Sequence, residues 1–133
     1  MPIEIAYLHG GYGIEIIGKG VVSGKEIYDG NRTIYSGDTL SRHKYQIVNF
    51  ANVERLEVSQ EDAVKLANQD IEASKTNPNI VIAVVAPLNH AFGLGRMWEA
   101  HANRSGFETK VFRKREEAVA WMNNRIAHQV TMK

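Results

Sequence analysis

The chain has 133 residues, the size of a single domain, and its 44% apolar and 23% charged content is typical of a globular protein. A formal net charge of +1 argues against a nucleic-acid binder, and no apolar run approaches the about 20 residues that span a bilayer. Because cysteine is absent, disulfides, thiol catalysis and cysteine-based zinc sites are excluded. We therefore expect a cytoplasmic protein without a metal or cofactor.

Two strands joined by a tight hairpin are predicted at the N-terminus. Residues 3–8 and 12–16 show an alternating pattern that is typical of strands. Between them, Gly10 and Gly11 can adopt the positive φ angles of a tight turn. Gly18 and Gly20 predict a bulge or bend near the end of the second strand.

The first predicted helix follows this hairpin. Ser23 and Glu26 fit a capping box, and apolar residues then recur at helical spacing as far as Tyr35. Residues 36–38 are expected to end this helix and open a loop. The apolar run at 45–50 is bounded by polar residues and predicts a buried strand.

Ser59 is the predicted N-cap of a second helix, which Asn77-Pro78-Asn79 terminates because proline disfavours the helical conformation in the preceding residue. Its expected inward face includes Leu66 and Asp70. Residues 80–86 are uncharged, rich in β-branched side chains and non-alternating, so both faces of this strand should be covered.

The last elements complete an α/β pattern. A third helix is predicted at 92–103, a short strand at 109–112 and a fourth helix at 116–132. The order is therefore ββαβαβαβα. Consecutive strand–helix–strand units require parallel pairing, so we expect one mixed, mostly parallel sheet with an N-terminal antiparallel hairpin and four helices, in a single domain spanning 1–133.

The C-terminal third carries a family resemblance. Residues 91–100, 107–112 and 116–122 read AFGLGRMWEA, FETKVF and EEAVAWM. This helix, a strand ending in Val-Phe and a helix start with the same EEA-x-A-W pattern resemble the SpoIIAA-like family of small bacterial proteins, which has the STAS-type fold. The chain also resembles the lipid-binding CRAL-TRIO class, but the members of that class are larger than 133 residues. We therefore expect no buried lipid cavity in this chain.

The resemblance implies a regulatory role through protein–protein interaction. In STAS-type anti-sigma-factor antagonists, a partner kinase phosphorylates a serine at the start of the helix after the third strand. Ser59 matches that serine by its position in the order of elements, while the second serine and the glycine of the family's Asp-Ser-Ser-Gly motif are absent. Glu57 and Glu61 flank it and would repel a phosphate.

The carboxyl ends of the parallel strands are the expected ligand-binding edge of such a sheet. This edge should bring together residues 49–52, 87–95 and 113–115, with Ser59 heading a helix on the same side. The helix N-termini and nearby cations would suit a small anion. The candidate ligand- or anion-binding residues are His90, Gly93, Gly95, Arg96, Arg113 and Lys114.

Each candidate also has a purely structural interpretation. Gly93 and Gly95 lack the third glycine of a dinucleotide fingerprint and can serve backbone packing. His90 can be an ordinary loop or capping residue, and Ser59 can simply cap its helix. No catalytic triad or metal motif is recognisable in the sequence, so we assign no catalytic residue.

The leading hypothesis is a non-enzymatic STAS-like domain that binds a protein partner or a small anion. The alternatives are an antagonist switched by phosphorylation of Ser59, and a small enzyme that uses His90 and Ser59 at the loop edge. A homodimer is a further hypothesis, because small α/β domains often cover an exposed sheet edge or helix face by symmetric pairing.

Overall fold

A single five-stranded sheet forms the centre of the protein. The computed structural model describes residues 2–126. In the sheet order β1-β2-β3-β4-β5, the pair β1–β2 is antiparallel and the other pairs are parallel, as predicted. The strands are β1 (Ile3–Leu8), β2 (Gly13–Ser23), β3 (Tyr45–Glu57), β4 (Val81–Val85) and β5 (Glu108–Phe112).

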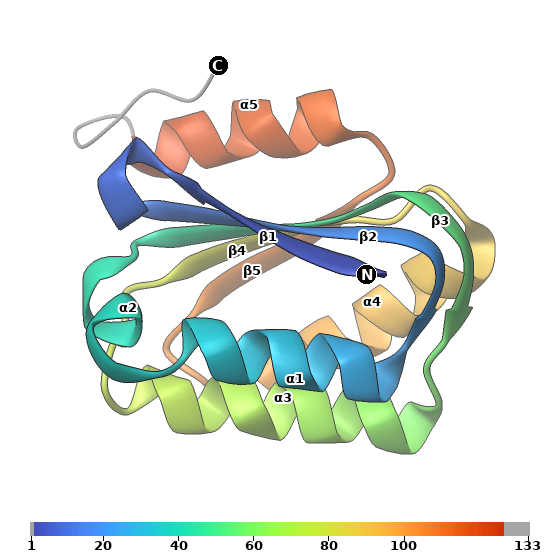
Figure 1. The fold of residues 1–133 in the computed structure, drawn as a ribbon, viewed down its shortest axis with the longest axis horizontal. Helices are drawn as coiled ribbons and strands as arrows, with labels where there is room; N and C mark the ends of the chain where they lie inside the picture. The colour runs from blue at the N-terminus through green and yellow to red at the C-terminus, as the bar shows by residue number, and fades with distance from the viewer. Residues whose placement is uncertain (1, 127–133) are drawn as a thin grey trace.

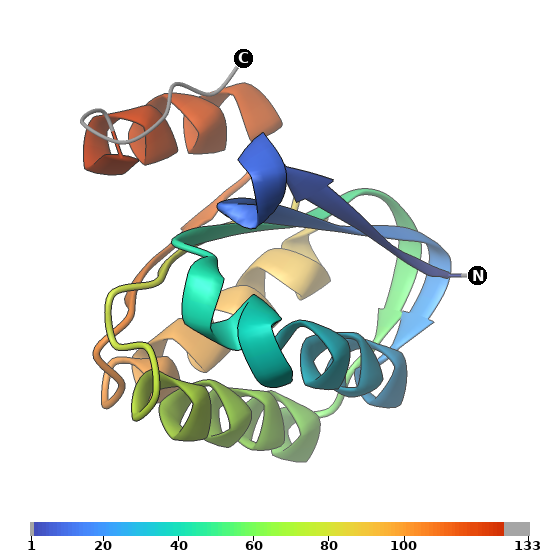
Figure 2. The same ribbon diagram turned by 60° about the vertical axis from the view of Figure 1, so that its left-hand side comes forward.

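Helices cover the two faces of the sheet unequally. One face is packed against α1 (Gly24–Ile34), α3 (Gln60–Ser74) and α4 (Asn89–Ala102), and α5 (Arg115–Ile126) crosses the other face (Figures 1 and 2). Ile82 and Val84 of β4 belong to the core under the three helices, whereas Ala83 and Val85 belong to the core under α5. The prediction that both faces of this strand are covered is therefore confirmed.

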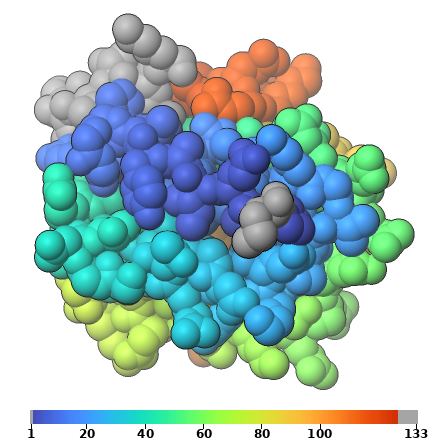
Figure 3. Space-filling model, viewed as in Figure 1, coloured from blue at the N-terminus to red at the C-terminus, as the bar shows by residue number. Residues whose placement is uncertain are grey.

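The β1–β2 hairpin forms one edge of the sheet. The two strands are joined through the short 3₁₀ turn η1 (His9–Gly11), in which Gly10 and Gly11 have positive φ angles. Figure 3 shows this hairpin, together with α1 and α2 (Gly37–Arg42), forming much of one face of the molecule. The predicted tight turn is thus confirmed, and it lies at the two glycines that can adopt positive φ angles without strain.

The structure has five α-helices within residues 2–126, and the prediction of four was wrong. Residues 36–38 were expected to open a loop, but α2 begins at Gly37. This six-residue helix buries none of its side chains, so it has no apolar periodicity by which the sequence could reveal it.

The strand β3 is longer than the predicted 45–50 because two irregularities break its alternation. Between Ile17 and Lys19 of β2, and again between Gly20 and Val21, β3 contains an extra residue relative to its partner. The buried side chains of this part are therefore three residues apart, at Phe50, Val53 and Leu56. The bend expected from Gly18 and Gly20 is confirmed, and Gly20 has a φ of +66°.

Past Asn49, β3 pairs only with β2, since β4 ends opposite Asn49 at Val85. The two strands continue as a curved ribbon that bends toward α1 and α3 (Figure 1). We call residues 50–57 the β3 extension. It closes one end of the space between the sheet and the helices.

Local signals located most helix starts. The predicted capping box of Ser23 with Glu26 is present, and the predicted N-cap Ser59 forms a second capping box with Asp62. Helix α4 begins at Asn89 rather than residue 92, because Asn89 and His90 are exposed polar residues without the apolar spacing that marked the rest. The last part of the predicted helix 116–132 lies outside the described residues.

Candidate functional site

The predicted loop edge does bring separate segments together. Asn49, Val85 and Phe112 are neighbours across β3, β4 and β5, so the segments that follow β4 and β5 start side by side. Arg113 donates hydrogen bonds to the Pro87 carbonyl (3.2 Å) and to Asn89 Oδ1 (2.8 Å). Its guanidinium also lies 4.2 Å from the centre of the Phe92 ring. The charge of Arg113 is therefore engaged within the protein.

The other charged candidates lie apart on the surface. His90 is exposed in the first turn of α4 and has no side-chain partner among the described residues. Arg96 is exposed and forms an ion pair with Glu99 at 3.3 Å. Lys114 is exposed beside the first turn of α5, where its carbonyl accepts from the Ala118 amide. Anion binding by these side chains stays a prediction.

The two candidate glycines differ in their surroundings. A Cβ atom at Gly95 would lie 3.1 Å from Val111 Cγ1, so this glycine allows α4 to approach β5 closely. A Cβ at Gly93 would have no neighbour within 4 Å. The packing interpretation therefore holds for Gly95, while Gly93 has open space beside it.

Ser59 is exposed and forms the capping box of α3. Its Oγ accepts a hydrogen bond from the Asp62 amide, and its own amide donates to Asp62 Oδ2, both at 3.0 Å. Ser59 follows the far end of the β3 extension, beyond the level at which β4 and β5 end. Its phosphorylation stays a prediction.

A buried ion pair at this edge was missed by the sequence analysis. Arg115, the first residue of α5, donates to both carboxylate oxygens of Glu15 on β2, at 2.7 and 3.1 Å, and Asn49 donates to Glu15 at 2.9 Å. Burial alone would raise the pKa of Glu15. The hydrogen bonds from Arg115 and Asn49 and the charge of Arg115 outweigh it, so the pKa lies below its usual value. The alternating pattern of residues 12–16 predicts that Glu15 faces solvent, so it does not indicate a buried ion pair.

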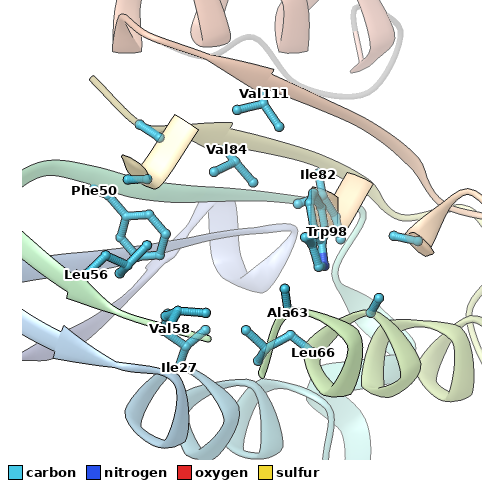
Figure 4. Packing of buried hydrophobic residues seen from close by; sticks show 14 of the residues in the cluster. Ile27, Phe50, Leu56, Val58, Ala63, Leu66, Ile82, Val84, Trp98 and Val111 are labelled. Carbon is cyan, nitrogen blue, oxygen red and sulfur yellow. The ribbon is translucent and has the colours of Figure 1, made fainter. Parts of the chain in front are cut away.

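An apolar cavity of about 60 Å³ lies between the sheet and the three helices. Figure 4 shows its walls, with Ile82 and Val84 pointing from the sheet toward Ile27, Ala63 and Leu66 of the helices. Phe50 and Leu56 of the β3 extension close one side. Of the candidate residues, Gly95 lies in the cavity wall, whereas His90, Gly93 and Arg96 do not.

One end of the cavity is polar and contains a fully buried carboxylate. Asp70 of α3 lines the cavity and is 3% exposed. Its two oxygens accept hydrogen bonds from the Tyr35 hydroxyl (2.6 Å) and from Trp98 Nε1 (2.7 Å). Burial raises its pKa to about 6, although these two hydrogen bonds favour the ionised form.

The polar end extends from Asp70 to a buried histidine. Gln46 of β3 lines the cavity, and its Nε2 donates to the Tyr35 hydroxyl and contacts His43 Nε2, both at 3.0 Å. His43 Nδ1 lies 2.8 Å from the Thr39 carbonyl, an acceptor, so the ring proton is on Nδ1 and Nε2 accepts from Gln46. Burial lowers the pKa of His43, which favours this neutral form.

Residues 2–126 contain neither a metal-binding cluster nor a membrane-spanning helix. No group of three or more His, Asp or Glu residues is arranged to hold a metal ion. No helix in this range is long and apolar enough to cross a membrane.

The comparisons with known proteins identify the fold. Neither a family model nor a curated protein matches the chain. Its structure is similar to the crystal structure of an uncharacterized protein of the DUF3478 family from Shewanella loihica PV-4, which has a SpoIIAA-like fold. The TM-score is 0.52 over 90% of both chains, at 13% sequence identity. The chain therefore has a SpoIIAA-like fold, as the sequence resemblance implied.

Proposed function

We propose that this SpoIIAA-like domain is a non-catalytic binding domain whose cavity holds a small, mostly apolar ligand. The observation that carries the proposal is the 60 Å³ cavity lined by side chains of the core. Protein interiors contain few voids larger than a water molecule. An unfilled void of this volume costs roughly 1–2 kcal/mol of stability, which an occupant of matching shape would restore.

The size of the cavity limits the ligand. One water-sized probe sphere occupies about 10–15 Å³, so 60 Å³ corresponds to about five non-hydrogen atoms. An acyl chain of a lipid is much larger than this. With a ceiling of about 1.5 kcal/mol per atom for very small ligands, the dissociation constant would be micromolar at best.

A regulatory role of the STAS type would follow from the way the cavity is built. Its walls come from α1, α3, α4, β3 and β4, so an occupant would contact all five elements at once. Filling the cavity would make these elements more rigid relative to one another. A protein partner that binds the outer faces of α1 and α3 would then distinguish the filled from the empty form.

The binding of 1-butanol, which has five non-hydrogen atoms, tests this proposal. In protein with labelled methyl groups, titration should shift the NMR signals of Ile27, Leu66, Ile82 and Val84, whose side chains line the cavity. Signals of Val119 on α5, on the other face of the sheet, should stay unchanged.

A variant that fills the cavity provides the control. Ala63→Leu adds three carbon atoms to the cavity wall and should abolish the butanol shifts. Ala100→Leu makes the same change at an exposed position of α4 and should retain them. Equal shifts in both variants, or shifts spread over the whole surface, would contradict the proposal.

A further inference from the structure

The polar end of the cavity contains a negative charge without a cation. Asp70 accepts hydrogen bonds only from the neutral donors Tyr35 and Trp98, and no lysine or arginine of the described residues pairs with it. A buried carboxylate is normally paired with a cation, because burial removes the water that stabilises its charge. Asp70 lines the cavity, so a cation that pairs with it could come from a ligand there.

The hydrogen-bond donors next to Asp70 are already used, and one amide proton of Asn31, which also lines the cavity, goes to Gln69 Oε1. The Tyr35 hydroxyl donates its proton to Asp70, and Trp98 Nε1 donates there as well. Both protons of the Gln46 amide go to Tyr35 and to His43. This orientation of the amide is fixed, because the opposite one would place the Gln46 oxygen against His43 Nε2, which is also an acceptor.

What remains at Asp70 and Gln46 is hydrogen-bond acceptor capacity. No described residue donates to Gln46 Oε1, although Gln46 is only 2% exposed and lines the cavity. Each Asp70 oxygen accepts one hydrogen bond and retains a free lone pair. A carboxylate or a phosphate would meet these acceptors and a like charge, with the second amide proton of Asn31 as the remaining donor in the cavity wall.

We infer that the cavity is selective for a small primary amine, with its ammonium group at Asp70 and Gln46 and its alkyl part against the apolar wall. This inference rests on the proposed function and adds the chemical class of the ligand. The ammonium group offers three donors and the missing positive charge. The alkyl part would contact Leu66, Ile82 and Val84, and a four-carbon chain matches the cavity volume.

Three probes of equal size test the selectivity at pH 7: butylamine, 1-butanol and butyrate. Butylamine should bind at least tenfold more tightly than 1-butanol, and butyrate should not bind, as measured by the same methyl shifts. If all three probes fail to bind, the proposed function is wrong. If 1-butanol binds as tightly as butylamine, or butyrate binds, the function stands and the selectivity for an amine is wrong.

The dependence on pH provides a second measurement that needs no variant. The groups facing Asp70 are Tyr35 at the end of α1, Trp98 of α4 and Gln46 of β3, with His43 beyond Gln46. Since the pKa of Asp70 is about 6, its ionised fraction rises about tenfold between pH 5 and pH 7. Butylamine affinity should rise by about the same factor and 1-butanol affinity should not. Equal changes for both probes would contradict the inference.

The Asp70→Asn variant tests the negative charge of the cavity separately from its shape. The variant keeps the size of the side chain and should lose the preference for butylamine over 1-butanol while it still binds 1-butanol. Retention of the preference would contradict a role for Asp70. Because the pH measurement uses the unaltered protein, the inference remains testable if this variant does not fold.

Discussion

The ring of Tyr45 fills the space where a side chain at Gly13 would begin. The two residues are neighbours on β3 and β2, and a Cβ atom at position 13 would overlap the tyrosine ring. Tyr45 is fully buried, and its hydroxyl lies 2.6 Å from His9 Nδ1 in the hairpin turn. The first parallel pairing of the sheet therefore depends on a residue without a side chain.

Gly13→Ala should lower the free energy of unfolding by about 3 kcal/mol, because neither the ring nor the strands can move without losing other contacts. Gly93→Ala is the matched control. Its new methyl group meets nothing within 4 Å and lies inside a helix, so it should raise stability by up to about 1 kcal/mol. Urea unfolding of both variants measures the difference; a neutral Gly13→Ala would show that the strands adjust to the methyl group.

Arg115→Ala should destabilise the protein by about 2 kcal/mol, because it leaves the Glu15 carboxylate buried with only Asn49 as a donor. The value is lower than for a fully buried pair, since the Arg115 side chain is 39% exposed. Lys19→Ala removes an exposed ion pair with Glu4 and should change stability by less than about 1 kcal/mol. Equal losses in urea unfolding would mean that burial of the Glu15 pair has no energetic consequence.

The stability of the protein should depend on pH through Asp70. The pKa of this carboxyl is about 6 in the folded protein against an ordinary value of 3.8, so the folded state retains a proton that the unfolded state loses between these values. The Asp70 contribution is therefore present below about pH 4 and is lost as the pH rises to 6. Relative to Asp70→Asn, the protein should be about 2 kcal/mol more stable at pH 4.5 than at pH 7.

The titration of His43 changes the stability of the protein with pH in the opposite direction. Burial lowers its pKa, so its contribution to stability is lost as the pH falls below 6.5, the ordinary value for histidine. Because His43 is present in both proteins, its effect cancels in the difference between the unaltered protein and Asp70→Asn. Thermal or urea unfolding at several pH values measures that difference, and a constant value would exclude a raised Asp70 pKa.

Ser59→Ala should cost about 1 kcal/mol through loss of the helix cap of α3. Ser36 provides the control, because it occupies the N-cap position of α2 without a side-chain cap hydrogen bond. Ser36→Ala should therefore cost clearly less. If the two changes have the same effect in urea unfolding, the capping hydrogen bond of Ser59 contributes nothing measurable.

The sequence alone determined the order of the strands and longer helices, because these depend on signals within a few neighbouring residues. The capping boxes at Ser23 and Ser59 and the uncharged run at 80–86 are such signals, and the structure confirms them. Where local periodicity was absent or interrupted, prediction failed. Helix α2 buries no side chain, and two extra residues break the alternation of β3.

Only the tertiary structure decided which residues come together at the candidate site. Asp70 was correctly predicted to face inward, but its partners Tyr35 and Trp98 are 35 and 28 residues away in the chain. Arg115, which the sequence indicated only as part of the loop-edge segment 113–115, pairs with Glu15 across 100 residues. The cavity walls come from five separate elements, and their approach depends on how the whole core packs. A volume left between side chains is a property of that packing, and no single segment encodes it.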